Sequence, residues 1–436
     1  MRAPEATDRL HWDINGEMSS AKKSAFHAAV FLASFLILFS RRPDTILNAQ
    51  FYAEDGARWY ADAYHLGWRC LLIPETGYLQ TVSRLIGLFA LLFPFAVAPL
   101  VMNLCALIVQ ILPVNLFLSS RFSAVPFPMR LIGSLLYLAL PNSIEIHANT
   151  TNIQWHLALL ACLVLLAKPA QSRIWALLDL SALVLVTIDS PLGIMLVPIA
   201  AALWWMRKDR WSKWCFAALI PGTFLQMLIV LFSQSHARVP GQNGATLARL
   251  TGILGGQIVL SSLLGVRTFA QLFLFSDRRL LFFVEATAMI AGLTLILYGF
   301  RSAPAGVKLF VVFAAGVLTL ALSNPIAGSD PNFPQWQYLQ IPGRSSRYYF
   351  FPILAFYASL LSLVSAGASA AAKGMRYVAL ALLMLLPVGI YRDWRYPRFA
   401  NLHFQSFATD FERAKPGNTI TIPINPAGWE MQLVKH

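Results

Sequence analysis

Long apolar runs that carry almost no charge constrain this chain more than any other feature. Residues 24–40, 307–322 and 374–390 approach the roughly 20 residues that a helix needs to cross the hydrocarbon core of a bilayer. Only 12% of the 436 residues are charged and 57% are hydrophobic, whereas soluble domains are about 25% charged. The sequence therefore predicts an all-α polytopic membrane protein and excludes a protein with a single membrane anchor.

About eleven transmembrane helices are expected. The second apolar run is too long for one crossing and contains Pro94 and Pro99, so we expect a short interfacial helix or a break at its start. The predicted spans are 25–40, 84–119, 130–141, 155–167, 174–189, 192–206, 214–232, 281–299, 308–323, 350–366 and 376–391.

The short connections predict the orientation, because cytoplasmic loops retain Lys and Arg whereas short translocated loops lose them. With a cytoplasmic N-terminal segment (1–24), every short cytoplasmic loop is basic, and the short outer connections 142–154 and 189–191 contain no Lys or Arg. The transmembrane domain (25–391) then has three long outer loops, and the tail lies outside with them. These outer segments are 41–83, 233–280, 324–349 and 392–436.

Two outer segments have a recognisable local pattern. The tail predicts an amphipathic helix at 404–415 and two alternating strands around residues 425–428, which together form a small α/β-hairpin element. The glycine-rich middle loop predicts a mobile loop with a half-buried helix. The net charge of +14 is spread between apolar runs and not along one polar face, so we expect membrane lipids and lipid phosphates as partners and no nucleic acid.

An acidic pair marks the first outer loop. Glu54 and Asp55 precede Gly56 and lie among the aromatic residues Tyr52, Trp59 and Tyr60. A carboxylate can accept a hydroxyl proton from a sugar while aromatic rings cover the apolar face of the ring, so this pattern suits a glycan site. The alternative is that Glu54 and Asp55 cap an interfacial helix that starts at Gly56, with the aromatic residues in the membrane belt. The Asp55 site is expected to be exposed to water.

Arginines mark the loop before the tenth span. Arg344 and Arg347 lie just before the expected membrane entry, where bidentate guanidinium groups can hold a lipid phosphate. Arg238 in the middle loop is a third candidate for this phosphate. Snorkelling of the same side chains to phospholipid head groups is the alternative.

Other polar and aromatic outer residues are candidates for binding the sugar or acceptor, or for an ordinary solvated loop and aromatic belt. They are His147, Asn152, Trp155, Trp336 and Tyr348. The histidines His65, His147 and His156 lack the spacing of metal ligands, so no metal or other cofactor is predicted.

The acidic "AEDG" element after the first span, the many later spans and the late "RYYFFP" element resemble the GT-C superfamily of membrane glycosyltransferases. The resemblance implies transfer of a sugar from a polyprenyl-phosphate donor to a glycan or lipid acceptor on the periplasmic face of a bacterial inner membrane. It implies inversion at the sugar, with Asp55 as the catalytic base and Glu54 as second choice. A glycan ligase or polymerase of the O-antigen type, and a non-enzymatic lipid-linked glycan flippase, are the rival interpretations.

Overall fold

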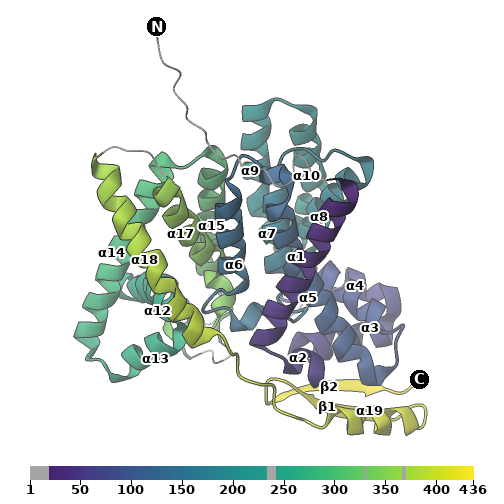
Figure 1. The fold of residues 1–436 in the computed structure, drawn as a ribbon. Helices are drawn as coiled ribbons and strands as arrows, with labels where there is room; N and C mark the ends of the chain where they lie inside the picture. The colour runs from purple at the N-terminus through teal and green to yellow at the C-terminus, as the bar shows by residue number, and fades with distance from the viewer. Residues whose placement is uncertain (1–18, 233–241, 329, 331, 366–369) are drawn as a thin grey trace.

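The computed structural model describes residues 19–232, 242–328, 330, 332–365 and 370–436, and for 370–372 the backbone alone. A bundle of helices forms most of the chain, and the tail lies below one end of that bundle (Figure 1). The main helices are α1 (Ser20–Arg41), α4 (Thr81–Ala90), α5 (Ala98–Leu118), α6 (Phe127–Leu138), α7 (Ile153–Leu166), α8 (Arg173–Asp189), α9 (Leu192–Arg207), α10 (Arg210–Phe232), α14 (Arg278–Ser302), α15 (Ala305–Ser323), α17 (Phe350–Ser365) and α18 (Ala370–Asp393).

Shorter elements fill the outer segments. They are α2 (Asp44–Leu47), η1 (Asp55–Tyr60), α3 (Ala61–Leu66), η2 (Gly67–Leu72), η3 (Phe95–Val97), η4 (Ser120–Phe122), η5 (Ile144–Ile146), α11 (Leu247–Thr251), η6 (Gly252–Leu260), α12 (Ser261–Leu264), α13 (Val266–Phe275), α16 (Gln335–Gln340), η7 (Ser346–Tyr349), α19 (Phe404–Arg413), β1 (Thr419–Ile424) and β2 (Trp429–Val434). The elements η1 and η6 are π-helical, and the other η elements are 3₁₀ turns.

Eight described helical segments are long and apolar enough to cross a membrane. They are Ser20–Arg41, Phe95–Leu118, Arg210–Phe232, Leu247–Leu264, Arg278–Ser302, Ala305–Ser323, Ser346–Ser365 and Lys373–Asp393. Helices α6, α7 and α9 are shorter apolar helices at positions where the sequence predicts spans. The chain is therefore a multi-pass membrane protein. The expected break in the second run is confirmed, because α4 ends at Ala90 and α5 begins at Ala98.

The helix predicted within the middle outer loop (233–280) is present at residues 247–264, but it is longer, more apolar and more buried than a helix in a mobile loop. These residues form a continuous apolar helical stretch, most of which is buried; Gly255 and Gly256 pack against Glu285 of α14, whereas Gly252 packs against Gln340 of α16. A Cβ atom at Gly255 would overlap the Glu285 carbonyl oxygen, so the glycines here permit close approach of two backbones. Glycine enrichment in this segment serves helix packing and not loop mobility.

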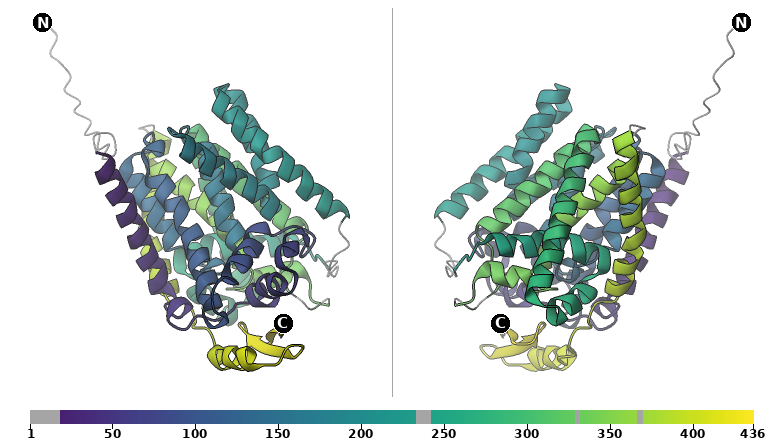
Figure 2. Two further views of the ribbon diagram at one scale, coloured as in Figure 1. Left: turned by 90° about the vertical axis from the view of Figure 1, so that its right-hand side faces the viewer. Right: turned by 90° about the vertical axis from the view of Figure 1, so that its left-hand side faces the viewer.

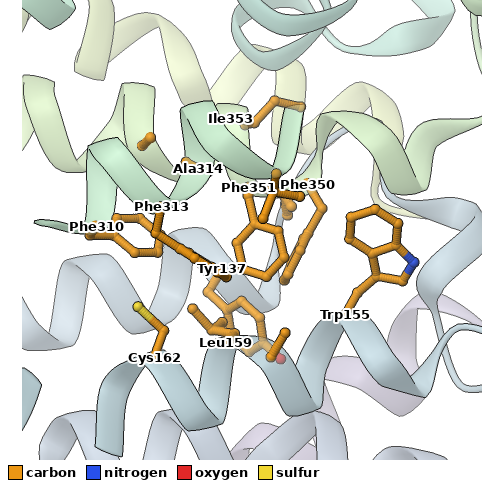
Figure 3. Close-up of a cluster of buried hydrophobic side chains, with 14 of the residues drawn as sticks. Tyr137, Trp155, Leu159, Cys162, Phe310, Phe313, Ala314, Phe350, Phe351 and Ile353 are labelled. Atoms are coloured by element: carbon orange, nitrogen blue, oxygen red, sulfur yellow. The ribbon is translucent and has the colours of Figure 1, made fainter. Parts of the chain in front are cut away.

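The centre of the bundle is aromatic where α15 and α17 meet α6 and α7 (Figure 3). Phe351 packs edge-on against Phe313 and against Phe350, with ring centroids 4.9 Å apart in both pairs. Trp155 lies in the same cluster, 6.0 Å from the Phe351 ring. The two phenylalanines of "RYYFFP" therefore serve packing, and they fix the direction in which α17 leaves the late loop.

The tail forms the predicted hairpin and helix. Strands β1 and β2 pair antiparallel from Thr419↔Val434 to Ile424↔Trp429, and α19 packs against β1. The tail and the first outer loop share a second hydrophobic core, which includes Phe51, Phe95, Phe404 and Phe411. Figures 1 and 2 show the tail beneath the end of the bundle that carries α2 and α3, opposite the start of α1.

Candidate functional site

Asp55 joins the first outer loop to the turn before α7. Its Oδ1 accepts hydrogen bonds from the Thr150 hydroxyl, the Thr151 hydroxyl and the Thr151 N–H, each at 2.7 Å. Its Oδ2 accepts the Thr150 N–H at 3.1 Å. The Asp55 side chain is 1% exposed. Burial raises the pKa of Asp55, although the four donors oppose that rise.

This geometry corrects the expectation that Asp55 is exposed to water. It also corrects the capping alternative, because no side chain caps the start of η1. The Asp55 carboxylate accepts hydrogen bonds from Thr150 and Thr151, and Thr150 lies 95 residues further along the chain. Asp55 is therefore arranged to hold two outer segments together.

Glu54 lies in a different environment from its neighbour. It is half-buried, and its carboxylate makes no hydrogen bond or ion pair with any other described residue. Burial raises the pKa of Glu54, and the nearby positive charge of Arg347 opposes this rise. A half-buried carboxylate that bonds no other described residue and whose pKa is raised is a stronger proton acceptor than an exposed one.

Arg347 is the cation whose charge acts on this carboxylate. Its guanidinium pairs with Glu145, its own N–H donates to Glu145 Oε2 at 3.2 Å, and its Nη2 donates to the Ile326 carbonyl at 2.5 Å. Glu145 therefore neutralises much of the charge that was predicted to bind phosphate. The arrangement fixes Arg347 between the late loop and the 142–154 connection.

Arg344 has the opposite character. Its side chain is exposed and its guanidinium lies 5.8 Å from the centre of the Tyr338 ring. It makes no ion pair or side-chain hydrogen bond within the part of the chain that the structure describes. Arg344 therefore keeps its donors available for an anion. Arg238, the third predicted phosphate ligand, falls outside the described residues.

Three of the six aromatic residues predicted to bind a sugar are fully packed into the core. Trp59 is 0% exposed, with its Nε1 3.4 Å from the Thr151 hydroxyl, and Tyr60 lies in the core shared with the tail. Trp155 is buried in the bundle core. These three residues are not available as a sugar platform, because their ring faces are covered by protein.

The remaining three aromatic candidates are placed at the edge of the site. Tyr348 is buried and its hydroxyl accepts the Ile326 N–H at 2.9 Å, while Trp336 donates its Nε1–H to the Leu322 carbonyl at 3.0 Å. Tyr52 is half-buried against Phe399. Burial and the charge of Glu145 raise the pKa of Tyr52 to about 12, so its phenol remains a neutral donor.

The polar connection 142–154 is ordered by its own hydrogen bonds. Asn152 donates its Nδ2–H to the Glu145 carbonyl at 2.9 Å, and His147 is 1% exposed against the Tyr396 ring. Both were expected to line the site, and both are buried. Burial lowers the pKa of His147 well below its usual value, so the ring is neutral at physiological pH.

The sequence interpretation missed Thr150, Thr151 and Glu145, which connect the site. Each lies in an outer connection that contains no Lys or Arg, and the adjacent threonines were the available signal for a carboxylate-binding turn. Tyr78 was missed as well, and its hydroxyl accepts the Gln154 Nε2–H at 3.4 Å.

Within the described ranges, no three His, Cys, Asp or Glu side chains gather in a way that could hold a metal ion. No protein-family model matches the sequence, and no curated protein matches it significantly. The site therefore rests on its own contacts: a Glu54 carboxylate that bonds no other described residue, an Asp55 carboxylate that accepts four hydrogen bonds, an Arg347 paired with Glu145, and an exposed Arg344.

Proposed function

We propose that this protein is a membrane glycosyltransferase that moves a sugar from a polyprenyl-phosphate carrier to a glycan or lipid acceptor. The observation that carries the proposal is the pairing of two adjacent carboxylates with opposite surroundings. Asp55 accepts hydrogen bonds from four donors, whereas Glu54 is half-buried and its carboxylate bonds only its own backbone N–H among the described residues. Such a division leaves one acid to position the loop and one to react.

The contacts favour Glu54 as the proton acceptor and Asp55 as its positioning residue, which reverses the order expected from the family resemblance. In the proposed step, the acceptor hydroxyl oxygen attacks the anomeric carbon and its proton passes to Glu54. The bond between that carbon and the carrier phosphate oxygen breaks, and the phosphate leaves with the electron pair. Attack opposite to the leaving group gives inversion.

Arg344 is the proposed ligand of the departing phosphate. It is exposed, unpaired within the described ranges and three residues before Arg347 at the start of the late span. A guanidinium fork matches phosphate oxygens and stabilises their developing charge. Arg347, held in place by its ion pair with Glu145, acts beside it through the effect of its positive charge on Glu54.

The proposed topology has eleven crossings, with the N-terminus in the cytoplasm and the tail in the periplasm of a bacterial inner membrane. It counts α8 as a crossing and keeps the largely buried Leu247–Leu264 segment within the outer loop 233–280. The basic short loops support this orientation. The start of α1 and the tail lie at opposite ends of the bundle, as an odd number of crossings requires (Figure 1). The site then faces the side on which lipid-linked sugars are used.

The test compares Glu54→Gln with wild-type protein in liposomes that contain polyprenyl-phosphate sugars and candidate acceptors. Loss of general base catalysis should lower the transfer rate by about 10² to 10⁴. Glu412→Gln is the matched control, since it makes the same change on the exposed face of α19. Transfer at the wild-type rate by Glu54→Gln would refute the assignment. Export of intact lipid-linked glycan without transfer would instead favour a flippase.

A further inference from the structure

Asn425, directly after β1, forms backbone hydrogen bonds on both sides of Tyr52. Its N–H donates to the Phe51 carbonyl at 3.1 Å, and its carbonyl accepts the Ala53 N–H at 2.5 Å. These two bonds make a short parallel bridge between the tail and the first outer loop. The tail thus contacts the loop immediately before the residue proposed as the base.

The Asn425 side chain joins a third segment to this bridge. Its Nδ2 donates to the Ala400 carbonyl at 3.0 Å, and its Oδ1 accepts the Ala400 N–H at 2.9 Å. The same Nδ2 lies 3.4 Å from Gln50 Oε1, which also accepts the Leu402 N–H at 3.0 Å. Asn425 is 4% exposed. Its amide therefore uses both its donor and its acceptor inside protein.

The loop needs such support at Ala53. Ala53 has a φ of 46°, in the left-handed region that residues with a Cβ atom rarely adopt. The Ala53 N–H donates to the Asn425 carbonyl. Ile424 also packs beside Gly56, where an added Cβ would lie 2.9 Å from the Phe51 Cβ and 3.1 Å from the Ile424 Cδ1. The tail therefore contacts both sides of Glu54 and Asp55.

We propose that Asn425 is a positioning residue for Glu54. By holding Ala53 left-handed, it maintains the bend from which Asp55 turns inward to Thr150 and Glu54 stays half-buried near Arg347. The catalytic part of this inference rests on the proposed function. The structural part does not, because it concerns the conformation of residues 51–57.

Asn425→Ala in the full-length protein tests both parts. We expect amide hydrogen exchange at Ala53 and Asp55 to quicken at least tenfold, since the variant keeps the backbone bridge but frees the Asn425 backbone from its side-chain anchors on Ala400 and Gln50. We expect kcat for sugar transfer to fall while the KM for the donor stays unchanged, because Arg344 does not contact this segment in the described contacts. Thr421→Ala, on the exposed face of β1, is the control and should change neither quantity.

Unchanged exchange at Ala53 and Asp55 in Asn425→Ala would overturn the inference. Faster exchange with an unchanged kcat would overturn its catalytic part. If Asn425→Ala does not fold, Gln50→Ala removes one acceptor from the same network and should quicken exchange at the same amides to a smaller extent. Absence of transfer by the wild-type protein would refute the proposed function alone, since the exchange result stands independently of it.

Discussion

Replacing Asp55 by Asn should weaken the fold near the site much more than replacing Glu54 by Gln. Three donors point at Oδ1 of Asp55 and one at Oδ2. In the Asp55→Asn variant, the amide oxygen can keep the three bonds as weaker neutral ones, but the amide NH₂ then faces the Thr150 N–H. A buried donor left without an acceptor costs about 1–3 kcal/mol, so about 2 kcal/mol is expected for this one contact. Glu54 has no described hydrogen bond to another residue to lose.

The assay is amide hydrogen exchange at Thr150 and Thr151. A loss of about 2 kcal/mol corresponds to roughly thirtyfold faster local opening. In Glu54→Gln the same amides should exchange at the wild-type rate while transfer is lost. If Asp55→Asn leaves Thr150 as protected as in the wild type, the saturated carboxylate is not what holds this turn. The assignment of a positioning role to Asp55 would then be wrong.

Three other predictions follow from the same contacts. Because burial raises the pKa of Glu54 above 4.5, transfer should fall as the pH drops through that raised pKa, and Glu54→Gln should remove this limb of the pH profile. Arg344→Lys should lower the rate of transfer at limiting donor about tenfold, because a charged hydrogen bond is worth about 1.5–3 kcal/mol. Arg347→Lys should instead loosen the late loop, because contacts with Glu145 are lost, and amide hydrogen exchange at Ile326 should become faster. A reporter that is active only in the periplasm should be active when it is fused at His436. An inactive reporter at this position would refute the periplasmic location of the tail.

The helices were predictable because the signal for each of them is local. Apolar runs of sufficient length predict α1, α14, α15 and α17, and Pro94 and Pro99 predict the break between α4 and α5. Alternation in residues 419–434 likewise determines which strand residues face the core, and the hairpin follows.

The site was only partly predictable, because its contacts join residues that are far apart in the chain. "AEDG" locates two carboxylates, yet whether each is free or saturated depends on Thr150 and Arg347. Aromatic residues near a membrane surface suit a sugar and a core equally well, and Trp59 belongs to the core. The glycines of residues 252–256 resemble a loop in composition, and their role becomes visible only when α14 and α16 lie against them.

The central claim is most directly tested by identifying both products of the reaction. Liposomes containing the protein, a polyprenyl-phosphate sugar and an acceptor glycan would be analysed by mass spectrometry for the carrier and by NMR for the new linkage. The proposed mechanism predicts one polyprenyl phosphate released for each sugar transferred, with the configuration at the anomeric carbon inverted. Release of polyprenyl diphosphate, or retention of that configuration, would contradict it.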